Sequence, residues 1–297
     1  IGPQQSLMAD FNANSLPRSV LGAGVSLKLQ HYPEVQSAAA DGIWFEVHTE
    51  NFCGIGGARL EALQVMAEKF PLSLHGVGAS LAGPDQLSKQ HLLWVQNLVE
   101  RIQPALISEH AVWSGIQEAY FADLLPFPRT KFILQQLAEG IHRYQETIDR
   151  PLLIENPTHY VNFCHEMSEP DFMLTLAKTT GCGLLLDITN LYLSQINCGV
   201  NARQYLDQIP PHLVGELHVA GFSSDPIEGD RLLIDSHDHA PNEEILSLLD
   251  YALARFGMRP VLLEWDDQIP ELNVLLQERE RIQSVLDRHL DSVDAAS

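Results

Sequence analysis

Eight short apolar runs recur along the chain, and each is followed by a carboxylate, a histidine or an asparagine. Between them lie segments with the i, i+3, i+4 apolar spacing of amphipathic helices, for example residues 58–70 and 242–257. Strands that alternate with helices and read as continuous apolar runs are typical of a buried parallel sheet. Eight such units predict a single (β/α)8 TIM barrel of the α/β class, and not an open doubly wound sheet. The runs are SLKLQH, IWFEVHTEN, LSLHG, LISEH, LLIENP, LLLDITN, LVGELHVAG and VLLEWD.

The barrel pattern covers residues 21–290, which we predict to be one domain. An α/β barrel commonly reaches the length of this 297-residue chain as a single domain. Its first strand is expected within LGAGVSLK, at residues 21–28, and a long insertion through DLLPFP follows the fourth run. The polar residues 1–20 are predicted to form a flexible leader, and residues 291–297 a tail.

The polar groups after the apolar runs are predicted to meet on one rim, because parallel barrel strands end on the same face. Carboxylate oxygen and imidazole nitrogen suit iron, manganese and zinc, and these groups are too numerous for one ion. Two or three metal ions bridged by a carboxylate would use them all. The predicted ligands are His48, His75, Glu109, Glu155, Asp187, His218, Asp235, His237 and Glu264.

These ligands rest on different arguments. Glu155, Asp187 and Glu264 directly follow apolar residues, where an unpaired acid is costly to bury, and few Lys or Arg residues lie nearby. Metal cations are the simplest counter-charge. The Asp-x-His pair at residues 235 and 237 is expected to share one side of an extended segment. His75 and His218, taken singly, fit a buried histidine bonded to a backbone carbonyl equally well.

Two strand ends offer competing side chains. Among His48, Glu50 and Asn51, the alternation of a strand cannot turn all three inward, and we favour His48. Between Glu109 and His110 we favour Glu109. Four further side chains are candidates for binding metal or for orienting a ligand: Asn51, His110, Asn156 and Asn190. Candidates for lining a substrate cleft, although aromatic residues more often serve packing, are Trp113, Ser114, His159, Tyr160 and Tyr192.

Charge and cysteine content narrow the classes of function. Lys and Arg total 18 against 39 Asp and Glu, a formal net charge of -21, which repels a nucleic-acid backbone unless bound cations invert the local field. No apolar run approaches the ~20 residues of a membrane span. The four cysteines lack CxxC spacing, which indicates free thiols in a reducing cytoplasm, and two of them, Cys53 and Cys198, are expected to be inert. We therefore predict a cytoplasmic protein that binds neither nucleic acid nor a membrane.

Eight motifs follow one another in order over nearly the whole chain: FEVHTEN, SLHGVG, SEHAVWS, LIENPTHY, LLLDITNLY, ELHVAG, IDSHDH and LLEWD. This ordered set resembles the multinuclear non-haem iron-dependent oxidative enzymes, the family that includes the oxidase of methanobactin biosynthesis. The resemblance implies a triose-isomerase-type barrel with two or three iron ions (Fe²⁺/Fe³⁺) on its carboxyl face. It also implies O₂-dependent oxidation of cysteine residues in a ribosomally made precursor peptide, with a separate partner protein that presents the peptide.

Carried over residue by residue, the resemblance implies a ligand set that largely repeats the one above. Glu155, Asn156 and Asn190 would then lie close to the metals. The implied ligands are His48, His75, Glu109, Asp187, His218, Asp235, His237 and Glu264.

The same arrangement is similar to the trinuclear zinc barrel of apurinic endonucleases and to xylose-isomerase-like sugar isomerases. We therefore expect a xylose-isomerase-like barrel, with zinc or manganese as the alternatives to iron. Three functions stay open: an iron-dependent oxidase, which we favour, a metal-dependent hydrolase or isomerase, and a non-catalytic partner-binding scaffold. The net charge of -21 disfavours cleavage of abasic DNA, and a scaffold has no reason to keep so many acids beside apolar runs.

Overall fold

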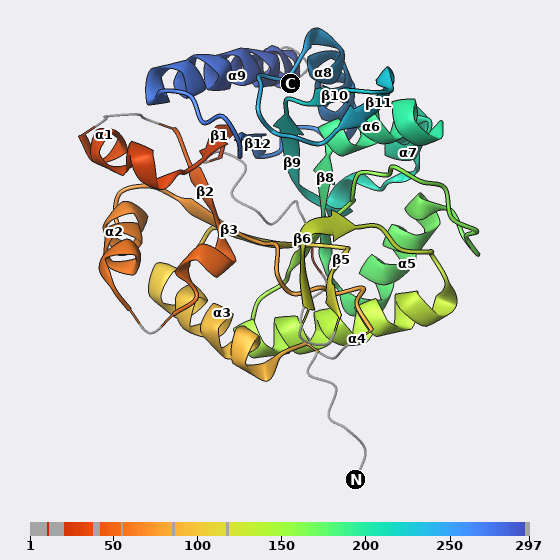
Figure 1. Cartoon of the computed structure of the whole chain (residues 1–297). Helices are drawn as coiled ribbons and strands as arrows, with labels where there is room; N and C mark the ends of the chain where they lie inside the picture. The colour runs from red at the N-terminus through yellow and green to blue at the C-terminus, as the bar shows by residue number, and fades with distance from the viewer. Residues whose placement is uncertain are drawn as a thin grey trace.

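The computed structural model describes residues 11, 21–37, 42–54, 56–84, 87–116 and 119–294. Within them, eight parallel strands close a barrel in the order β1-β12-β9-β8-β7-β4-β3-β2, ringed by helices (Figure 1). The predicted TIM barrel is therefore confirmed. The strands are β1 (Ala23–Ser26), β2 (Phe45–His48), β3 (Leu72–Gly76), β4 (Leu106–His110), β7 (Leu153–Glu155), β8 (Gly183–Asp187), β9 (Val214–Ala220) and β12 (Val261–Glu264).

The first apolar run is the one that departs from its prediction. Strand β1 lies within the expected residues 21–28 but ends at Ser26, and the polar end of SLKLQH belongs to a short 3-10 helix, η2 (Leu29–His31). His31 bonds there through Nε2 to the Pro270 carbonyl at 2.9 Å. Each of the other runs coincides with one barrel strand, so their polar ends do reach the rim.

Helices cover the outside of the barrel, and several begin at a side-chain cap. Ser88, Thr130, Ser168, Asn201 and Asn242 each accept a hydrogen bond from the backbone N–H three residues later. The helices are α1 (Tyr32–Ser37), α2 (Ala58–Ala67), α3 (Lys89–Ile102), α4 (Lys131–Ile148), α5 (Glu169–Thr180), α6 (Ile188–Cys198), α7 (Ala202–Gln208), α8 (Glu243–Phe256) and α9 (Leu272–Asp294), with further 3-10 turns η3 (Thr49–Phe52) and η4 (Pro211–Leu213). None of the helices in the described residues is long and apolar enough to span a membrane.

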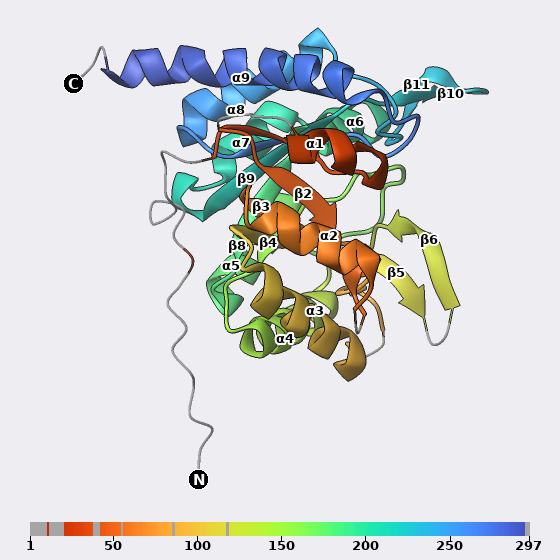
Figure 2. The same cartoon turned by 90° about the vertical axis from the view of Figure 1, so that its left-hand side faces the viewer.

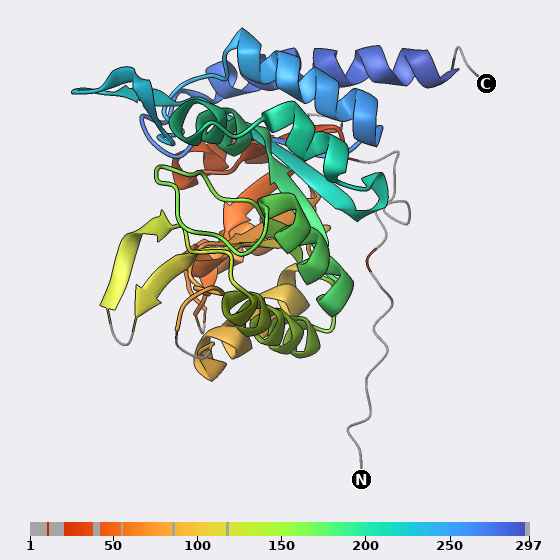
Figure 3. The same ribbon diagram turned by 90° about the vertical axis from the view of Figure 1, so that its right-hand side faces the viewer.

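Two antiparallel hairpins project from the same side of the barrel (Figures 2 and 3). One pairs β5 (Trp113–Ile116) with β6 (Ala119–Leu125) and forms the predicted insertion after the fourth run. The other pairs β10 (Ser223–Asp225) with β11 (Gly229–Ile234). Of the predicted leader only Phe11 is among the described residues, and of the predicted tail residues 291–294 belong to α9, while the rest lies outside them.

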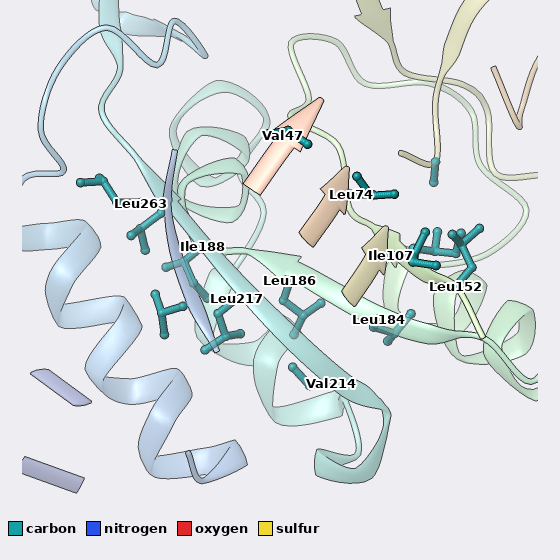
Figure 4. Close-up of a cluster of buried hydrophobic side chains, with 14 of the residues drawn as sticks. Val47, Leu74, Ile107, Leu152, Leu184, Leu186, Ile188, Val214, Leu217 and Leu263 are labelled. Atoms are coloured by element: carbon teal, nitrogen blue, oxygen red, sulfur yellow. The ribbon is translucent and has the colours of Figure 1, made fainter. Parts of the chain in front are cut away.

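The apolar core has two parts, one on each face of the strands. Outward-facing residues pack against the helices, and Figure 4 shows Leu74, Ile107 and Leu217 among them. A smaller group fills the floor of the barrel interior, at the amino ends of the strands. It consists of Phe11, Trp44, Leu106, Leu153, Leu185 and Leu262.

A bulge in β9 changes which residues face the interior. Leu184 pairs with Val214 but Leu185 pairs with Glu216, so Gly215 is an extra residue on β9. A Cβ on Gly215 would lie 2.6 Å from Leu153 Cδ2, so this glycine faces the crowded floor. Because of the bulge, Glu216 also faces inward, and His218 follows two residues later on the same face.

Candidate metal centre

The described residues form four adjoining groups of potential metal ligands inside the barrel, one of which is Glu46–His75–His218. The other three share acids at the carboxyl ends of the strands. In each group the ligand atoms all lie within 4.8 Å of one another. Glu155 belongs to the first and second groups, and Glu264 to the second and third. Because a carboxylate has two oxygens, each of these acids could bridge two metal ions. These three groups are His75–His110–Glu155, Glu155–Asp187–His218–Glu264 and His48–Glu264–Asp266.

The residues of this centre fit a set of cations. Glu155, Asp187 and His218 are at most 1% exposed, and each has a buried oxygen or nitrogen without a hydrogen-bond partner. Within the described part of the chain, the one lysine or arginine that forms an ion pair in this region is Lys28, which contacts Asp266. Buried carboxylates without a counter-charge cost several kcal/mol each, and bound metal ions would supply the positive charge.

Two of the histidines have one ring nitrogen held by a neighbour and the other aimed at a carboxylate. His110 Nδ1 bonds to the Gly76 carbonyl at 2.9 Å, which fixes the proton on Nδ1 and leaves Nε2, 3.0 Å from Glu155, free to bind a metal. His75 Nδ1 bonds to Ser108 Oγ at 2.7 Å, and its Nε2 lies 3.2 Å from Glu155. Such contacts commonly orient the histidine ligands of a metal.

His218 lies the other way round. Its Nδ1 is 3.3 Å from Glu264 Oε2, on the side of the metal groups, while Nε2 faces Glu216 at 3.5 Å and Glu46 at 3.6 Å. Burial opposes a charge on the ring, yet the carboxylates of Glu46, Glu216 and Glu264 raise the pKa of His218 well above its usual value. The interior therefore carries an excess of negative charge that favours cations.

The pKa values of two acids of the centre, Asp187 and Glu155, are shifted in opposite directions. Burial, reinforced by the negative charges of Glu155 and Asp235, raises the pKa of Asp187 well above its usual value. Burial also disfavours the charged form of Glu155, but His110 and His75 outweigh it and lower the pKa of Glu155 to about 2. Glu155 is thus held as a carboxylate, the form that binds metal.

The Asp-x-His pair converges, although not by the predicted geometry. Both residues follow β11, and His237 has a left-handed backbone with φ of 48°, so the segment is not extended and strand alternation does not apply. The turn nevertheless places Asp235 Oδ1 2.7 Å from His237 Nε2, and His237 Nδ1 3.6 Å from Glu264 Oε1. Thr158 Oγ1 donates to Asp235 Oδ2 at 3.0 Å and holds it at the mouth of the barrel.

The preference for Glu109 over His110 is corrected by the direction of β4. Ser108 bonds to His75 inside the barrel, so alternation turns His110 to the interior and Glu109 to the outer face. Glu109 instead joins a separate group with Glu50 and His91. The sequence signal for this choice was that the polar residues Ser108 and His110 are two positions apart and so share one face of a strand, whereas Glu109 lies on the other.

Strand alternation also does not decide between the residues after β2. The chain turns into η3 directly after His48, and Asn51 is exposed on this turn, away from the three ligand groups. Glu50 accepts hydrogen bonds from the backbone of Val77 and Gly78. His48 stays at the rim, with its Nε2 3.6 Å from Asp266 Oδ2.

Asn156 and Asn190 hold Asp187 in position. Asn156 Oδ1 accepts from the backbone N–H of Asp187 at 2.9 Å, and its amide nitrogen donates to the Asp187 carbonyl at 3.2 Å. Asp187 Oδ1 caps α6 by accepting from the Asn190 N–H at 2.7 Å, and Asn190 Nδ2 donates to the Asn156 carbonyl. With Asp187 Oδ1 engaged, Oδ2 is the oxygen without a partner.

The predicted cleft residues mostly fix the surrounding loops. Tyr160 accepts from the Asp235 N–H at 2.9 Å, and His159 forms a buried pair with Glu169. Trp113 donates to the Ala82 carbonyl, and Tyr192 packs against Phe222 with the rings tilted and their centroids 5.6 Å apart. Ser114 is buried, and its hydroxyl has no partner among the described residues.

Three acids in or beside the centre escaped the sequence prediction: Asp266 and Glu46, which belong to ligand groups, and Glu216, which faces His218. Glu46 and Glu216 each precede a predicted histidine by two residues, and Asp266 follows Glu264 by two. This i, i+2 spacing is the signal that could have found the two strand acids, because alternate strand residues share a face.

This chain is similar to known proteins in sequence and in fold. Residues 22–287 match the sequence model of the family described as RiPP precursor modification enzyme MbnB/TglH/ChrH, where a RiPP is a ribosomally made and modified peptide. A UPF0276 protein of Rhizobium meliloti (strain 1021) is 46% identical over 273 residues, which cover 90% of this chain and 87% of that protein. A UPF0276 protein of Caulobacter vibrioides (strain NA1000 / CB15N) is 44% identical over 265 residues, covering 89% and 94%.

Solved structures similar to this chain share its barrel at low sequence identity. A xylose isomerase-like TIM barrel protein from Mycobacterium smegmatis in complex with magnesium has a TM-score of 0.62 at 13% identity, covering 94% of this chain and 99% of that one. Endonuclease IV from Thermus thermophilus has a TM-score of 0.55 at 14% identity, covering 91% and 99%. These likenesses confirm the expected xylose-isomerase-like fold.

The family match begins just before β1 and ends within α9, so it includes every group of the metal centre. The resemblance inferred from the eight ordered motifs is confirmed by it. This chain belongs to the MbnB/TglH/ChrH family of RiPP precursor modification enzymes.

Proposed function

We propose that this chain is a multinuclear iron-dependent oxidase that uses O₂ to modify cysteine residues of a ribosomally made precursor peptide. The observation that carries the proposal is the sharing of Glu155 and Glu264 among three adjoining ligand groups. Two or three iron ions would fit these groups, each pair joined by a carboxylate. Bound iron would supply one-electron redox chemistry with O₂.

The chain's own residues would hold the ions and keep their ligands in the right state. His75, His110 and Glu155 would hold one ion, and Asp187 and His218 would complete a second position together with Glu155 and Glu264. Asp235 and His237 lie above Glu264 and would close the centre from the β11 side. The hydrogen bond from His110 Nδ1 to the Gly76 carbonyl would keep Nε2 unprotonated for ligation.

Membership of a peptide-modifying family supports a peptide substrate. The cysteine thiol would enter at the carboxyl mouth of the barrel, beside the acids and histidines that would hold the metal ions. A reducing cytoplasmic compartment, favoured by the free cysteines of the chain, would keep that thiol available. We further propose that a separate protein presents the precursor peptide.

A hydrolase or isomerase of the same fold is the alternative for the same residues, with zinc or manganese in place of iron. The solved barrels that resemble this chain include epimerases and an endonuclease, but at 10–14% identity they share its fold alone. Family membership favours peptide modification over these reactions. Metal analysis distinguishes the two classes.

The test is metal content and O₂ consumption of anaerobically purified protein. We expect two or three equivalents of iron per chain, an absorption spectrum that changes on reduction, and O₂ uptake with a mass change when a cysteine-containing precursor peptide is added. The same peptide with serine in place of cysteine should be inert.

Asp187→Ala should lose iron and O₂ uptake, because it removes a fully buried ligand. His212→Ala, on an exposed histidine of η4, serves as the matched control and should retain both. Zinc as the sole bound metal, together with no O₂ uptake, would overturn the oxidase proposal.

A further inference from the structure

A second cluster of metal-ligand side chains lies outside the barrel wall. It joins Glu50 of η3, His91 of α3 and Glu109 of β4, whose ligand atoms lie within 4.8 Å of one another. Glu50 Oε1 is 3.7 Å from His91 Nε2. Since Glu109 alternates with the inward-facing Ser108 and His110, the cluster is on the opposite face of β4 from the central metal groups.

Two glycines leave the space that the carboxylates occupy. A Cβ on Gly76 would lie 2.1 Å from Glu109 Oε2, and a Cβ on Gly78 would lie 2.9 Å from Glu50 Oε1. The backbone N–H groups of Val77 and Gly78 donate to the two oxygens of Glu50 at 3.1 and 2.9 Å. The end of β3 is thus shaped around both acids, and its backbone orients the side chain of Glu50.

The cluster contains buried polar atoms that lack partners. Glu109 is fully buried, and its Oε2 has no hydrogen-bond donor; His91 Nε2 is also buried without a partner. The fully buried Tyr144 hydroxyl has no partner either, and burial together with the charges of Glu109 and Glu50 raises its pKa well above the usual value. No ion pair with lysine or arginine in the described residues includes Glu50 or Glu109, so the two acids lack a protein cation.

We propose that Glu50, His91 and Glu109 bind a second, separate divalent transition-metal ion such as Zn²⁺. Two carboxylates and an imidazole are a ligand set that such ions accept, and the ion would satisfy the unpartnered atoms of Glu109 and His91. It would tie η3 and α3 to β4, directly behind His110 of the central groups. Glu109 is then a metal ligand, but of this outer site and not of the central one.

The competing account is a proton shared between the two acids. Burial and the nearby charge of Glu50 raise the pKa of Glu109 well above its usual value, so without a cation Glu109 would be protonated. A shared proton satisfies one oxygen and leaves His91 Nε2 without a partner. Metal binding therefore separates the two accounts.

The experiment counts zinc in full-length protein whose central groups are disabled. In a His75→Ala/Glu155→Ala/Glu264→Ala variant, which removes at least one ligand from every central group, we expect one tightly bound zinc per chain by elemental mass spectrometry after stripping with a chelator and dialysis against Zn²⁺. Adding His91→Ala should remove it, whereas adding the control His212→Ala should not. The proposal would be overturned if the variant that still has His91 bound no zinc. It would also be overturned if adding His91→Ala left the bound zinc unchanged.

A second measurement covers the case in which the variant with disabled central groups fails to fold. In the otherwise unaltered chain, His91→Ala should lower bound zinc by one equivalent, and the rise of the unfolding temperature on adding zinc to stripped protein should shrink. An equal zinc count for His91→Ala and the unaltered chain would contradict the outer site. Neither result depends on whether the central groups hold iron or oxidise a peptide.

Discussion

For His110 and His218, the ring nitrogen that faces away from the metal groups determines how the ring is oriented. His110 uses Nδ1 to bond the Gly76 carbonyl, whereas His218 turns Nε2 toward the acids Glu46 and Glu216 and leaves Nδ1 for the centre. A single-residue step along β4 separates the central groups, which contain His110, from the outer cluster, which contains Glu109. At this scale, orientation decides function more than residue type does.

The four cysteines allow a test of burial at the residue scale. Cys182 is fully buried, and burial raises its pKa to about 12, while Cys164 is exposed. At pH 8 a thiol with that pKa is a thiolate only about 0.01% of the time, and the reactive form is the thiolate. We expect iodoacetamide to modify Cys164 in the native protein and to leave Cys182 untouched, as measured by peptide mass spectrometry.

Unfolding in urea is the control for that labelling, because it should make both thiols reactive. Cys53 should also react slowly in the native state, since burial, Glu50 and Glu109 raise its pKa to about 12. Native labelling of Cys182 at the rate of Cys164 would contradict the buried position of Cys182, directly before β8.

At the scale of elements, the β9 bulge affects both the packing of the barrel floor and the residues that face its mouth. The extra residue Gly215 lets the strand present a small residue to the crowded floor and still turn Glu216 and His218 inward. Likewise, α6 begins at Asp187, whose capping bond to Asn190 fixes the carboxylate at the rim. The points at which strands bulge and helices begin therefore position metal ligands as well as packed side chains.

Gly215→Ala should destabilise the barrel. Its methyl group would lie 2.6 Å from Leu153 Cδ2 and 2.7 Å from Phe11, and overpacking of this kind typically costs about 1–3 kcal/mol. The measurement is the free energy of unfolding in urea. Gly54→Ala is the matched control, because nothing lies within 4 Å of its new Cβ, and it should change stability by less than about 0.5 kcal/mol. Equal stabilities of the two variants would contradict the packed floor.

At the scale of the whole molecule, the net charge of -21 sets which partners can approach. Although the barrel resembles endonuclease IV in fold, a surface this acidic repels a phosphate backbone. Lys28, near the mouth, already forms an ion pair with Asp266. The same surface would attract a positively charged segment instead.

We expect the metal-loaded protein to show no binding to duplex DNA that contains an abasic site. An electrophoretic shift assay at low salt, about 50 mM, is the most permissive measurement, because phosphate contacts strengthen as salt falls. Endonuclease IV itself provides the positive control. A shift that weakens steeply with added salt would mean that bound cations had inverted the field at the mouth.

Much of the fold and part of the centre could be predicted from local sequence. The apolar runs before Glu155, Asp187 and Glu264 marked strands and rim acids together, because burial of an unpaired acid is costly wherever it occurs. Prediction failed where direction depended on pairing: Glu109 was preferred to His110, and Asp235 and His237 were expected on an extended segment. The acids Glu46 and Glu216 were missed because they lie inside the strands and not at their ends.

The sequence by itself determined the eight-stranded barrel, the acid and histidine chemistry of its rim and the family, since periodicity, apolar runs and ordered motifs are local properties of the chain. Only the tertiary structure decided which neighbours face inward, which carboxylates are shared and that Glu50, His91 and Glu109 form an outer cluster. The reason is that strand register, the bulge at Gly215 and the left-handed turn at His237 arise from contacts between distant segments.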